Sequence, residues 1–466
     1  MWWFLALSVS YVAGMGGLVT WATLSTQRRH LQAWRDAAVS CGLEVVEVSR
    51  VGIGTGRLKL AARAGAVEVL IQSSRDRKYR TLLVVKVPGP PGFTAVRLSR
   101  ELYKPSPARE IEVGDEAFDK TFSIEGPARL VLALLGMEAR RLLSDINAEC
   151  QLAIGGGELR AATYEVDVPI ILSLLLDLAH RFAHPDVVRR LSENALCDPQ
   201  AGVRLRNLLL LARELPGDPR TIETLRAARA DASPEIRLRA AVELGPEGRD
   251  VLIELAESDV DDAWSALALS FVGRELPLEH ARAILLSALR RRRIETAGAC
   301  LEALGHRGAA AVDVLAKVLA REKGGLATAA ALALGTTGST AAEPPLIPAL
   351  QHERLDVRVA AANALARVGS AAAVLPLKEA AERSAGDQDL RRATRQAIAE
   401  IQSRLQGASP GQLSLAGAEA GQLSLAQVEA GQLSLATDPA GQLSLPSAEP
   451  GQLSLSDAED ADPARV

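Results

Sequence analysis

Three side chains near the middle of the chain have the types and the spacing of a metal site. Asp177, His180 and His184 fall at positions i, i+3 and i+7, on one face of a helix. Carboxylate and imidazole groups arranged in this way can bind a divalent metal ion. However, no glutamate stands beside His180 as in a zinc-protease motif, and Pro185 ends the helix. We therefore expect polar surface residues near a helix end and predict no metal site.

A second candidate is the run Gly52-x-Gly54-x-Gly56, whose backbone amides could wrap a phosphate group. The dinucleotide-binding pattern needs a third glycine where Arg57 stands, and then a helix. Here the residues from Leu58 onward alternate like a strand, which favours a hairpin turn. The chain also lacks nucleophile-elbow, Walker and kinase motifs. The sequence therefore predicts no catalytic residue and no cofactor.

The four cysteines, Cys41, Cys150, Cys197 and Cys300, stand far apart with no Cys-x-x-Cys pair. This spacing is not typical of a metal site or of a disulfide framework. We expect buried single thiols in a reducing compartment.

The sharpest charged feature is the run Arg290, Arg291, Arg292 and Arg293, in a turn between two expected helices. Such a run could bind anionic lipid, nucleic acid or an acidic protein segment, and a solvated turn is the simpler alternative. The chain has a net charge of -4, and residues 409–466 contribute -7 from eight acids and one Arg. The remaining +3 of residues 1–408 does not favour a nucleic-acid binder, so we infer no specific nucleic acid or small-molecule ligand.

The C-terminal residues 409–466 contain the pentapeptide Gly-Gln-Leu-Ser-Leu five times, starting at Gly411 and recurring every ten residues. With two leucines per copy and no aromatic residue, this tail cannot build a core, and we expect disorder. Leu-Ser-Leu places both leucines on one side of an extended chain, which suits addition to a partner's sheet edge, and five copies would give avidity. The alternative is a low-complexity spacer. The possible partner-binding leucines are Leu413, Leu415, Leu423, Leu425, Leu433, Leu435, Leu443, Leu445, Leu453 and Leu455.

At the other end, residues 2–24 carry no charge and are long enough to cross about 30 Å of hydrocarbon. Tryptophans stand near both ends of the run, and Arg28, Arg29 and Arg35 follow it. The positive-inside rule then places the N-terminus outside and the rest of the chain in the cytoplasm of a bacterial cell. A cleaved signal peptide is the rival interpretation, but its basic start and Ala-x-Ala site are missing. We expect a single-pass protein of the inner membrane.

Residues 43–166 predict a small α+β domain. Period-two runs rich in Val and Leu predict strands at 43–48, 58–60, 67–71 and 82–87, with others at 94–98, at 109–113 and on both sides of residues 155–157. Residues 114–122 indicate a turn entering a strand, with Phe118 and Phe122 packing inward. Helices are expected at 127–146 and 168–182.

Residues 185–405 are helical and repetitive. Glycines that end successive helices, Gly245, Gly273, Gly305, Gly335 and Gly369, recur with a period near 31 residues. This period indicates helix pairs that stack side by side, since one pair alone cannot bury its Leu and Ala face.

The clearest copy ends in Leu-Asp-Val-Arg-Val-Ala-Ala-Ala-Asn-Ala-Leu-Ala-Arg-Val-Gly, at residues 355–369. It resembles the HEAT family, in particular the short bacterial HEAT repeats similar to those of phycobilisome lyases. The resemblance implies an α-solenoid of six or seven repeats. It does not imply lyase chemistry, because the repeat motif contains no catalytic residues.

Together these features predict a mainly α protein: a HEAT-like α-solenoid preceded by one transmembrane helix and a small α+β domain, with a disordered C-terminal tail. We expect a membrane-anchored, non-enzymatic scaffold that binds protein partners through the solenoid and the multivalent tail. The alternative is an enzyme or lyase-like factor whose site lies in residues 43–166 or in the groove of the solenoid. A cluster of acids and His with perturbed pKa values would favour the enzyme.

Overall fold

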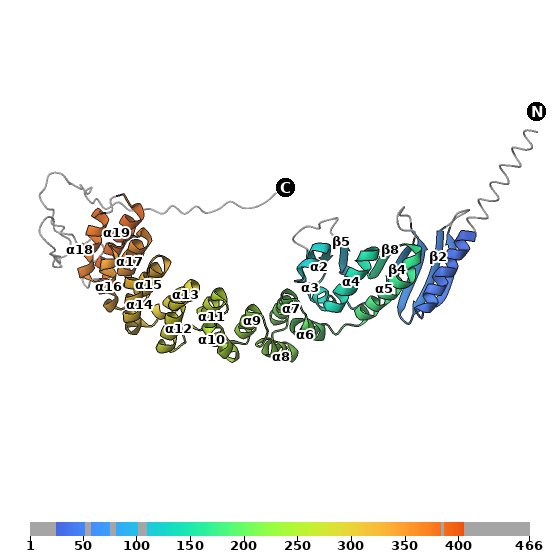
Figure 1. Ribbon diagram of the computed structural model, residues 1–466, viewed down its shortest axis with the longest axis horizontal. Helices are drawn as coiled ribbons and strands as arrows, with labels where there is room; N and C mark the ends of the chain where they lie inside the picture. The colour runs from blue at the N-terminus through green and yellow to red at the C-terminus, as the bar shows by residue number, and fades with distance from the viewer. Residues whose placement is uncertain (1–24, 52–56, 75–80, 101–109, 384–385, 405–466) are drawn as a thin grey trace, which may run out of the picture. The chain divides into compact units, whose positions relative to one another are not determined.

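The fold was analysed in a computed structural model that describes residues 25–51, 57–74, 81–100, 110–383 and 386–404 (Figure 1). The expected membrane helix at residues 2–24, the glycines at 52–56 and the repeated tail lie outside these residues. Among the residues that are described, none of the helices has both the length and the apolar composition needed to cross a bilayer.

The N-terminal part contains an eight-stranded sheet in which every described pair of neighbours is antiparallel. The strand order is β1-β2-β3-β4-β8-β7-β5-β6. The strands are β1 (Glu44–Val51), β2 (Arg57–Ala64), β3 (Val67–Ser73), β4 (Thr81–Lys86), β5 (Arg97–Arg100), β6 (Phe122–Glu125), β7 (Gln151–Gly155) and β8 (Glu158–Thr163). The predicted strand at 94–98 is partly a 3-10 turn (Phe93–Ala95), and residues 110–113 form no strand.

One face of this sheet carries the core. In β3, Val67, Val69 and Ile71 are buried, whereas the alternate residues are partly or fully exposed, as the period-two pattern predicts. The helix at residues 25–40, through Trp34, and the predicted helix α5 (Val168–Ala183) pack into the same core. This N-terminal sheet domain is therefore covered by helices on one side, and its core includes residues on both sides of the expected bounds 43–166.

The prediction for residues 114–122 was correct in part. Helix α2 (Glu116–Thr121) takes the place of the expected turn, because Asp115 accepts a hydrogen bond from Phe118 N as an N-cap, and strand β6 then begins at Phe122. Asp119 also accepts from the amides of Val113 and Gly114. Phe118 and Phe122 still pack inward, with their ring centroids 4.7 Å apart.

The single helix expected at 127–146 is two helices, α3 (Ala128–Leu134) and α4 (Met137–Glu149). The break at Gly136 has a tertiary cause. A Cβ atom there would lie 2.5 Å from Oδ1 of Asn194, which belongs to the first repeat helix. The chain bends here so that its backbone can pack against that helix.

The C-terminal part consists of helices that form seven consecutive pairs within the described residues. The helices are α6 (Val187–Cys197), α7 (Ala201–Glu214), α8 (Pro219–Ala228), α9 (Pro234–Glu243), α10 (Arg249–Glu257), α11 (Asp262–Val272), α12 (Leu278–Arg290), α13 (Ile294–Gly305), α14 (Val312–Arg321), α15 (Gly325–Thr336), α16 (Glu343–Ala349), α17 (Leu355–Val368), α18 (Val374–Arg383) and α19 (Gln388–Arg404). The first helices α10, α12 and α14 follow one side of the array, and the second helices α11, α13 and α15 follow the other (Figure 1). This arrangement confirms the predicted helical repeats.

The repeating glycines are explained by close packing between second helices. A Cβ on Gly273 would lie 2.8 Å from the Cβ of Ala303, and one on Gly335 would lie 2.6 Å from the Cα of Ala364. Each pair of positions joins one second helix to the next. Only Gly245 among the five has a left-handed backbone, with φ +58°. The glycines therefore mainly allow neighbouring helices to approach, and the buried alanines serve the same purpose.

Buried Arg–Asp pairs tie successive pairs together and extend into the sheet domain. Arg204 of α7 donates to both carboxylate oxygens of Asp231, at 2.8 and 2.9 Å. In the same manner, Arg140 of α4 donates to both oxygens of Asp198 at 2.9 and 3.0 Å, and to Asp115 at 3.0 Å. Bidentate pairs of this kind fix geometry as well as charge. The sheet domain is therefore joined to the first helix pair by the same contact that joins one pair to the next.

Candidate functional site

An open hollow on the second-helix side lies across α15, α17 and the start of α19. It has a volume of about 670 Å³. Its floor is apolar: Leu332 and Leu355 are 46% and 36% exposed, and Val359 lies between helices. We call this surface the α15–α17 groove. Exposed leucines on the surface of a repeat array are available to a partner's apolar side chains.

The rim of the groove is polar and preorganised. Arg354 donates to both oxygens of Asp356 at 3.0 and 2.9 Å, and the Thr328 hydroxyl donates to the same carboxylate. The hydrogen bonds from Arg354 are the main reason that the pKa of Asp356 falls to about 2, so this carboxyl group is ionised under ordinary conditions. The exposed amide of Asn363 lies in the same groove. Such a surface offers an apolar floor and an amide that can both donate and accept hydrogen bonds.

The arginine run forms the turn between α12 and α13. Arg293 N donates to Ala288 O and Arg292 N donates to Leu289 O, which is the hydrogen-bond pattern of a Schellman motif. In that motif the residue with left-handed backbone is usually glycine, but here it is Arg292, with φ +59°. No other described residue apart from glycine has positive φ. A non-glycine residue in this conformation costs about 1–2 kcal/mol.

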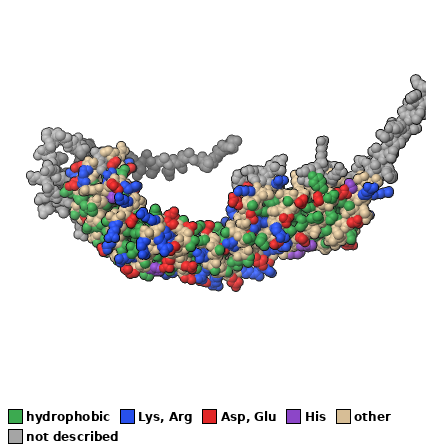
Figure 2. Space-filling model, in the orientation of Figure 1, with side chains coloured by type: hydrophobic (Ala, Val, Ile, Leu, Met, Phe, Trp, Pro, Cys, Tyr) green, Lys and Arg blue, Asp and Glu red, His purple; other side chains and the backbone are tan. Residues whose placement is uncertain are grey.

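The four arginines have different environments. Arg291 pairs with Asp259, and Arg293 pairs with Asp259 and Asp262 of the preceding repeat. Arg290 donates to a backbone carbonyl, and Arg292 faces a hollow of about 340 Å³ that is also lined by Arg321 and Lys323. Lys and Arg side chains gather on this part of the array, around α12 and α14 (Figure 2). The run is therefore partly structural.

Sequence reasoning missed Arg321 and Lys323. Arg321 is the last residue of α14 and Lys323 lies in the turn that follows, about thirty residues further along the chain than the run itself. Only the stacking of one repeat on the next brings the two turns together. The repeat period near 31 residues could have paired these turns, because it relates each position to an equivalent one in the next repeat.

The candidate metal ligands Asp177, His180 and His184 lie on α5 and directly after it. Asp177 and His180 are exposed on α5, and His184 is the residue that follows the end of this helix. Within the described ranges, no three His, Cys, Asp or Glu side chains are grouped as metal ligands. β1 and β2, which flank the glycine run, pair antiparallel up to Val51 and Arg57. A strand therefore follows the run, as predicted.

The expectation of buried thiols is correct for Cys150 and Cys300 and wrong for Cys197, which is exposed at the end of α6. Cys41 is half-buried. The helical pattern explains this exposure, because the inward positions of α6 are Leu191 and Ala195 and Cys197 lies two residues further on, on the outer side.

Among the described carboxyl groups, Asp119 is the one whose pKa is raised, chiefly by burial. Its oxygens accept hydrogen bonds from two backbone amides near α2. It lines neither the groove nor the hollow beside Arg292. This carboxyl group belongs to the local structure of the α2 turn.

Comparison with known proteins finds a family match for part of the helical array. Residues 313–399 match the family model of HEAT repeats. These residues run from α14 to α19 and include the groove. No curated protein matches the chain.

Several solved structures are similar at low scores. An engineered protein is 20% identical, with a TM-score of 0.29 over 39% of this chain and 96% of that one. Human deoxyhypusine hydroxylase in complex with glycerol is 18% identical, with a TM-score of 0.21 over 46% and 95%. An importin beta crystallised in an ammonium sulfate condition is 16% identical, with a TM-score of 0.36 over 52% and 38%. Similarity at this level has no bearing on function.

Proposed function

We propose that this chain is a non-enzymatic scaffold that binds protein partners through the α15–α17 groove. The observation that carries the proposal is an open apolar groove within the part of the chain that matches HEAT repeats. Its exposed leucines are held on rigid helices whose opposite sides are buried, so little entropy is lost when a partner binds. The groove is open and its lining residues come from three neighbouring helices, α15, α17 and α19, which suits an extended segment of a protein.

We further propose that the scaffold is anchored in a bacterial inner membrane, with most of the chain in the cytoplasm. The proposal is supported by the uncharged residues 2–24 and by Arg28 and Arg29 directly after them. Both arginines are exposed on the helix at residues 25–40, which follows the apolar run. The five-copy tail would add a second, multivalent binding element.

Paired substitutions on the two sides of the array test the role of the groove. Leu332→Asp with Leu355→Asp places two charges on the floor of the groove, where a partner's apolar side chains would have to desolvate them. We expect proteins that are crosslinked to the wild-type chain in cells to be lost from this variant. The measurement is mass spectrometry of the crosslinked material.

The matched control is Leu286→Asp with Leu375→Asp. These leucines are 46% and 52% exposed on the first helices α12 and α18, on the other side of the array. The control should retain the partners that the groove variant loses. Equal losses in both variants, or no loss in either, would contradict binding at the groove.

A further inference from the structure

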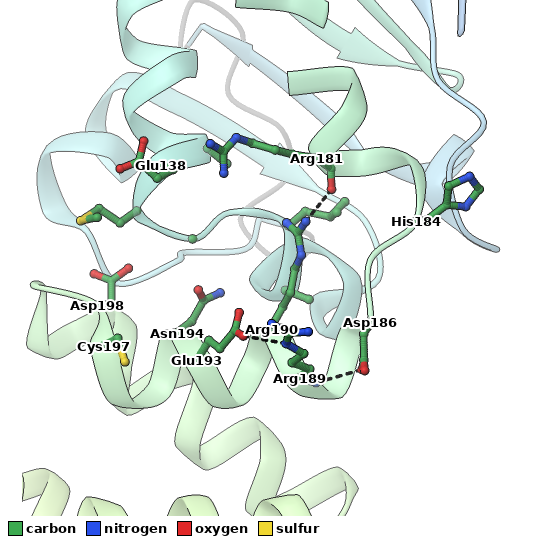
Figure 3. A pocket seen from close by; sticks show the side chains of 15 residues that line it. Glu138, Arg181, His184, Asp186, Arg189, Arg190, Glu193, Asn194, Cys197 and Asp198 are labelled. Atoms are coloured by element: carbon green, nitrogen blue, oxygen red, sulfur yellow. Dashed lines mark hydrogen bonds and ion pairs between the residues drawn. The ribbon is translucent and has the colours of Figure 1, made fainter. Parts of the chain in front are cut away.

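A cavity of about 490 Å³ lies where the sheet domain meets the first repeat helix (Figure 3). Its walls come from the end of α3, the start of α4, the end of α5 and one side of α6. Ala133, Leu134 and Met137 form an apolar part of the wall, and Asn194 contributes an amide. The volume falls in the range of sites that hold small molecules.

Most charged groups around this cavity are paired. Arg189 donates to Glu193 at 2.8 Å, and Asp186 accepts from Arg220 of α8 at 2.8 Å. Asp198 is held by Arg140, and Glu138 lies 3.7 Å from Arg141. These four pairs neutralise all four carboxylates that line the cavity.

Unlike the charged groups above, Arg181 and Arg190 form no ion pair within the described residues. Arg190 rises from α6 to donate a hydrogen bond, 2.8 Å long, to the backbone carbonyl of Arg181 at the end of α5 (Figure 3). Within the described part of the chain, neither guanidinium has a carboxylate at ion-pair distance. Burial lowers the pKa of Arg190 and the charge of Arg181 lowers it further, while Glu193 acts in the opposite direction. Two positively charged side chains, exposed Arg181 and half-buried Arg190, therefore line the same cavity.

We propose that the cavity binds a small molecule with a phosphate group, which lies between Arg181 and Arg190. An anion between two guanidinium groups would remove their repulsion, and each planar fork can bind two oxygens. A phosphate has enough oxygens to serve both forks at once, whereas a carboxylate offers one bidentate edge. The remaining space beside Ala133, Leu134 and Met137 exceeds what a free phosphate ion fills, so the ligand is a small phosphomonoester.

The position of the cavity gives this ligand a role beyond the proposed scaffold function. Arg181 belongs to the sheet domain and Arg190 to the first helix pair, so a bound phosphate would link the two parts. The ligand would thereby stabilise the junction from which the helical array extends. Ligand binding would be coupled to the stability of this junction.

Thermal unfolding of the full-length chain in detergent tests the proposal. The probes are inorganic phosphate and glycerol 3-phosphate, with ionic strength held constant by sodium chloride. We expect each probe to raise Tm, by about 2–4 °C at saturation. A larger rise with glycerol 3-phosphate supports a phosphomonoester, and equal rises would overturn the assignment of the organic part. If neither probe raises Tm, there is no phosphate site.

Two variants locate the site. Arg181→Gln should abolish the rise while leaving the Tm of the unliganded chain equal or higher, because it removes a repelling charge. A lower unliganded Tm in this variant would indicate a structural role and overturn the proposal. The double variant Arg189→Gln with Glu193→Gln removes a charge and its partner together, so the rise should persist. Loss of the rise there as well would show that the anion binds elsewhere.

Discussion

Among single residues, the glycines at the ends of the second helices are the ones whose replacement we expect to disturb packing most, because a Cβ atom there would overlap the next helix. Gly335→Ala would place a Cβ 2.6 Å from Ala364 Cα, in a backbone that can barely move because both helices are packed. We expect a loss of roughly 1–3 kcal/mol in the free energy of unfolding from this overpacking. The measurement is urea denaturation of the full-length chain.

Gly298→Ala is the matched control. Gly298 lies inside α13, and no atom lies within 4 Å of the Cβ position. Alanine should stabilise the helix here by roughly 0.5–1 kcal/mol, since it restricts the unfolded chain. If both variants had the same effect, close packing of the helices would not be the reason for the repeating glycines.

The cysteines give a second prediction at this scale. Burial raises the pKa of Cys150 and Cys300 to about 12, so both stay protonated at pH 8 in the folded protein. Cys197 is exposed. We expect one fast reaction with a thiol reagent at pH 8, abolished by Cys197→Ser, a slower reaction of half-buried Cys41, whose pKa burial raises, and reaction of Cys150 and Cys300 only after unfolding. Fast labelling that survives Cys197→Ser and requires Cys150 or Cys300 would contradict the fold.

Sequence patterns predicted residues whose role is repeated along the chain. Ala361 and its neighbours in the clearest repeat are fully buried, as helical periodicity requires. Patterns failed where a residue depends on a distant partner. Gly136 breaks a helix because of Asn194, and Arg292 acquires two cationic neighbours from the next repeat. Periodicity describes a chain locally, whereas these residues are placed by tertiary contacts.

At the scale of elements, the turn between α12 and α13 carries a measurable strain. Arg292→Gly should stabilise the protein by roughly 0.5–1 kcal/mol, because glycine adopts the left-handed conformation without the steric cost and loses part of the gain to chain entropy. Arg290→Gly, in the last helical position two residues earlier, should instead destabilise by a similar amount. Chemical denaturation of the two variants measures the change in the free energy of unfolding, which should be a gain for Arg292→Gly and a loss for Arg290→Gly. A loss of stability in Arg292→Gly would mean that its side chain holds the turn.

The helices and strands that a local sequence pattern defines were predicted, whereas those that depend on particular contacts were not. The helix pairs and six of the eight strands were recognised from period and composition, because each carries in its own sequence the spacing of buried residues that its secondary structure requires. Helix α2 was missed because Phe118 and Phe122 resemble a strand approach, while the hydrogen bonds of Asp115 and Asp119 decide the local structure. The groove could be anticipated as a surface of the solenoid, but its residues could not, because exposure on α15 depends on where α17 lies.

For the whole molecule, orientation is the first property to test. Alkaline phosphatase fused after residue 40 should be inactive, because the positive charges after residue 24 keep this side in the cytoplasm. Replacing Arg28, Arg29 and Arg35 with glutamate should raise its activity by weakening that bias. High activity in the unmodified fusion would reverse the proposed topology.

The tail provides the second whole-molecule prediction. If its five copies bind one type of partner, deleting them one at a time should weaken binding in graded steps. Leu413→Ala with Leu415→Ala, repeated in every copy, should abolish binding, whereas scrambling only the spacers should have little effect. The measurement is a pull-down that compares the proteins held by each tail. Identical sets from the wild-type and all-alanine tails would leave the segment as a tether.

The core that begins at Trp34 continues through the sheet and the first helix pairs as far as Ala240. Helix α9 contributes Ile236 and Ala240 to this core and Leu238 and Ala241 to the one that follows. Because the sheet domain comes first in the chain, we expect it to fold first during synthesis and to present an apolar surface against which α6 and α7 then pack. Later pairs then add in order. Within the described residues α19 (Gln388–Arg404) is the last helix of the array, so we expect local opening to begin there, where separation disturbs the fewest neighbouring pairs.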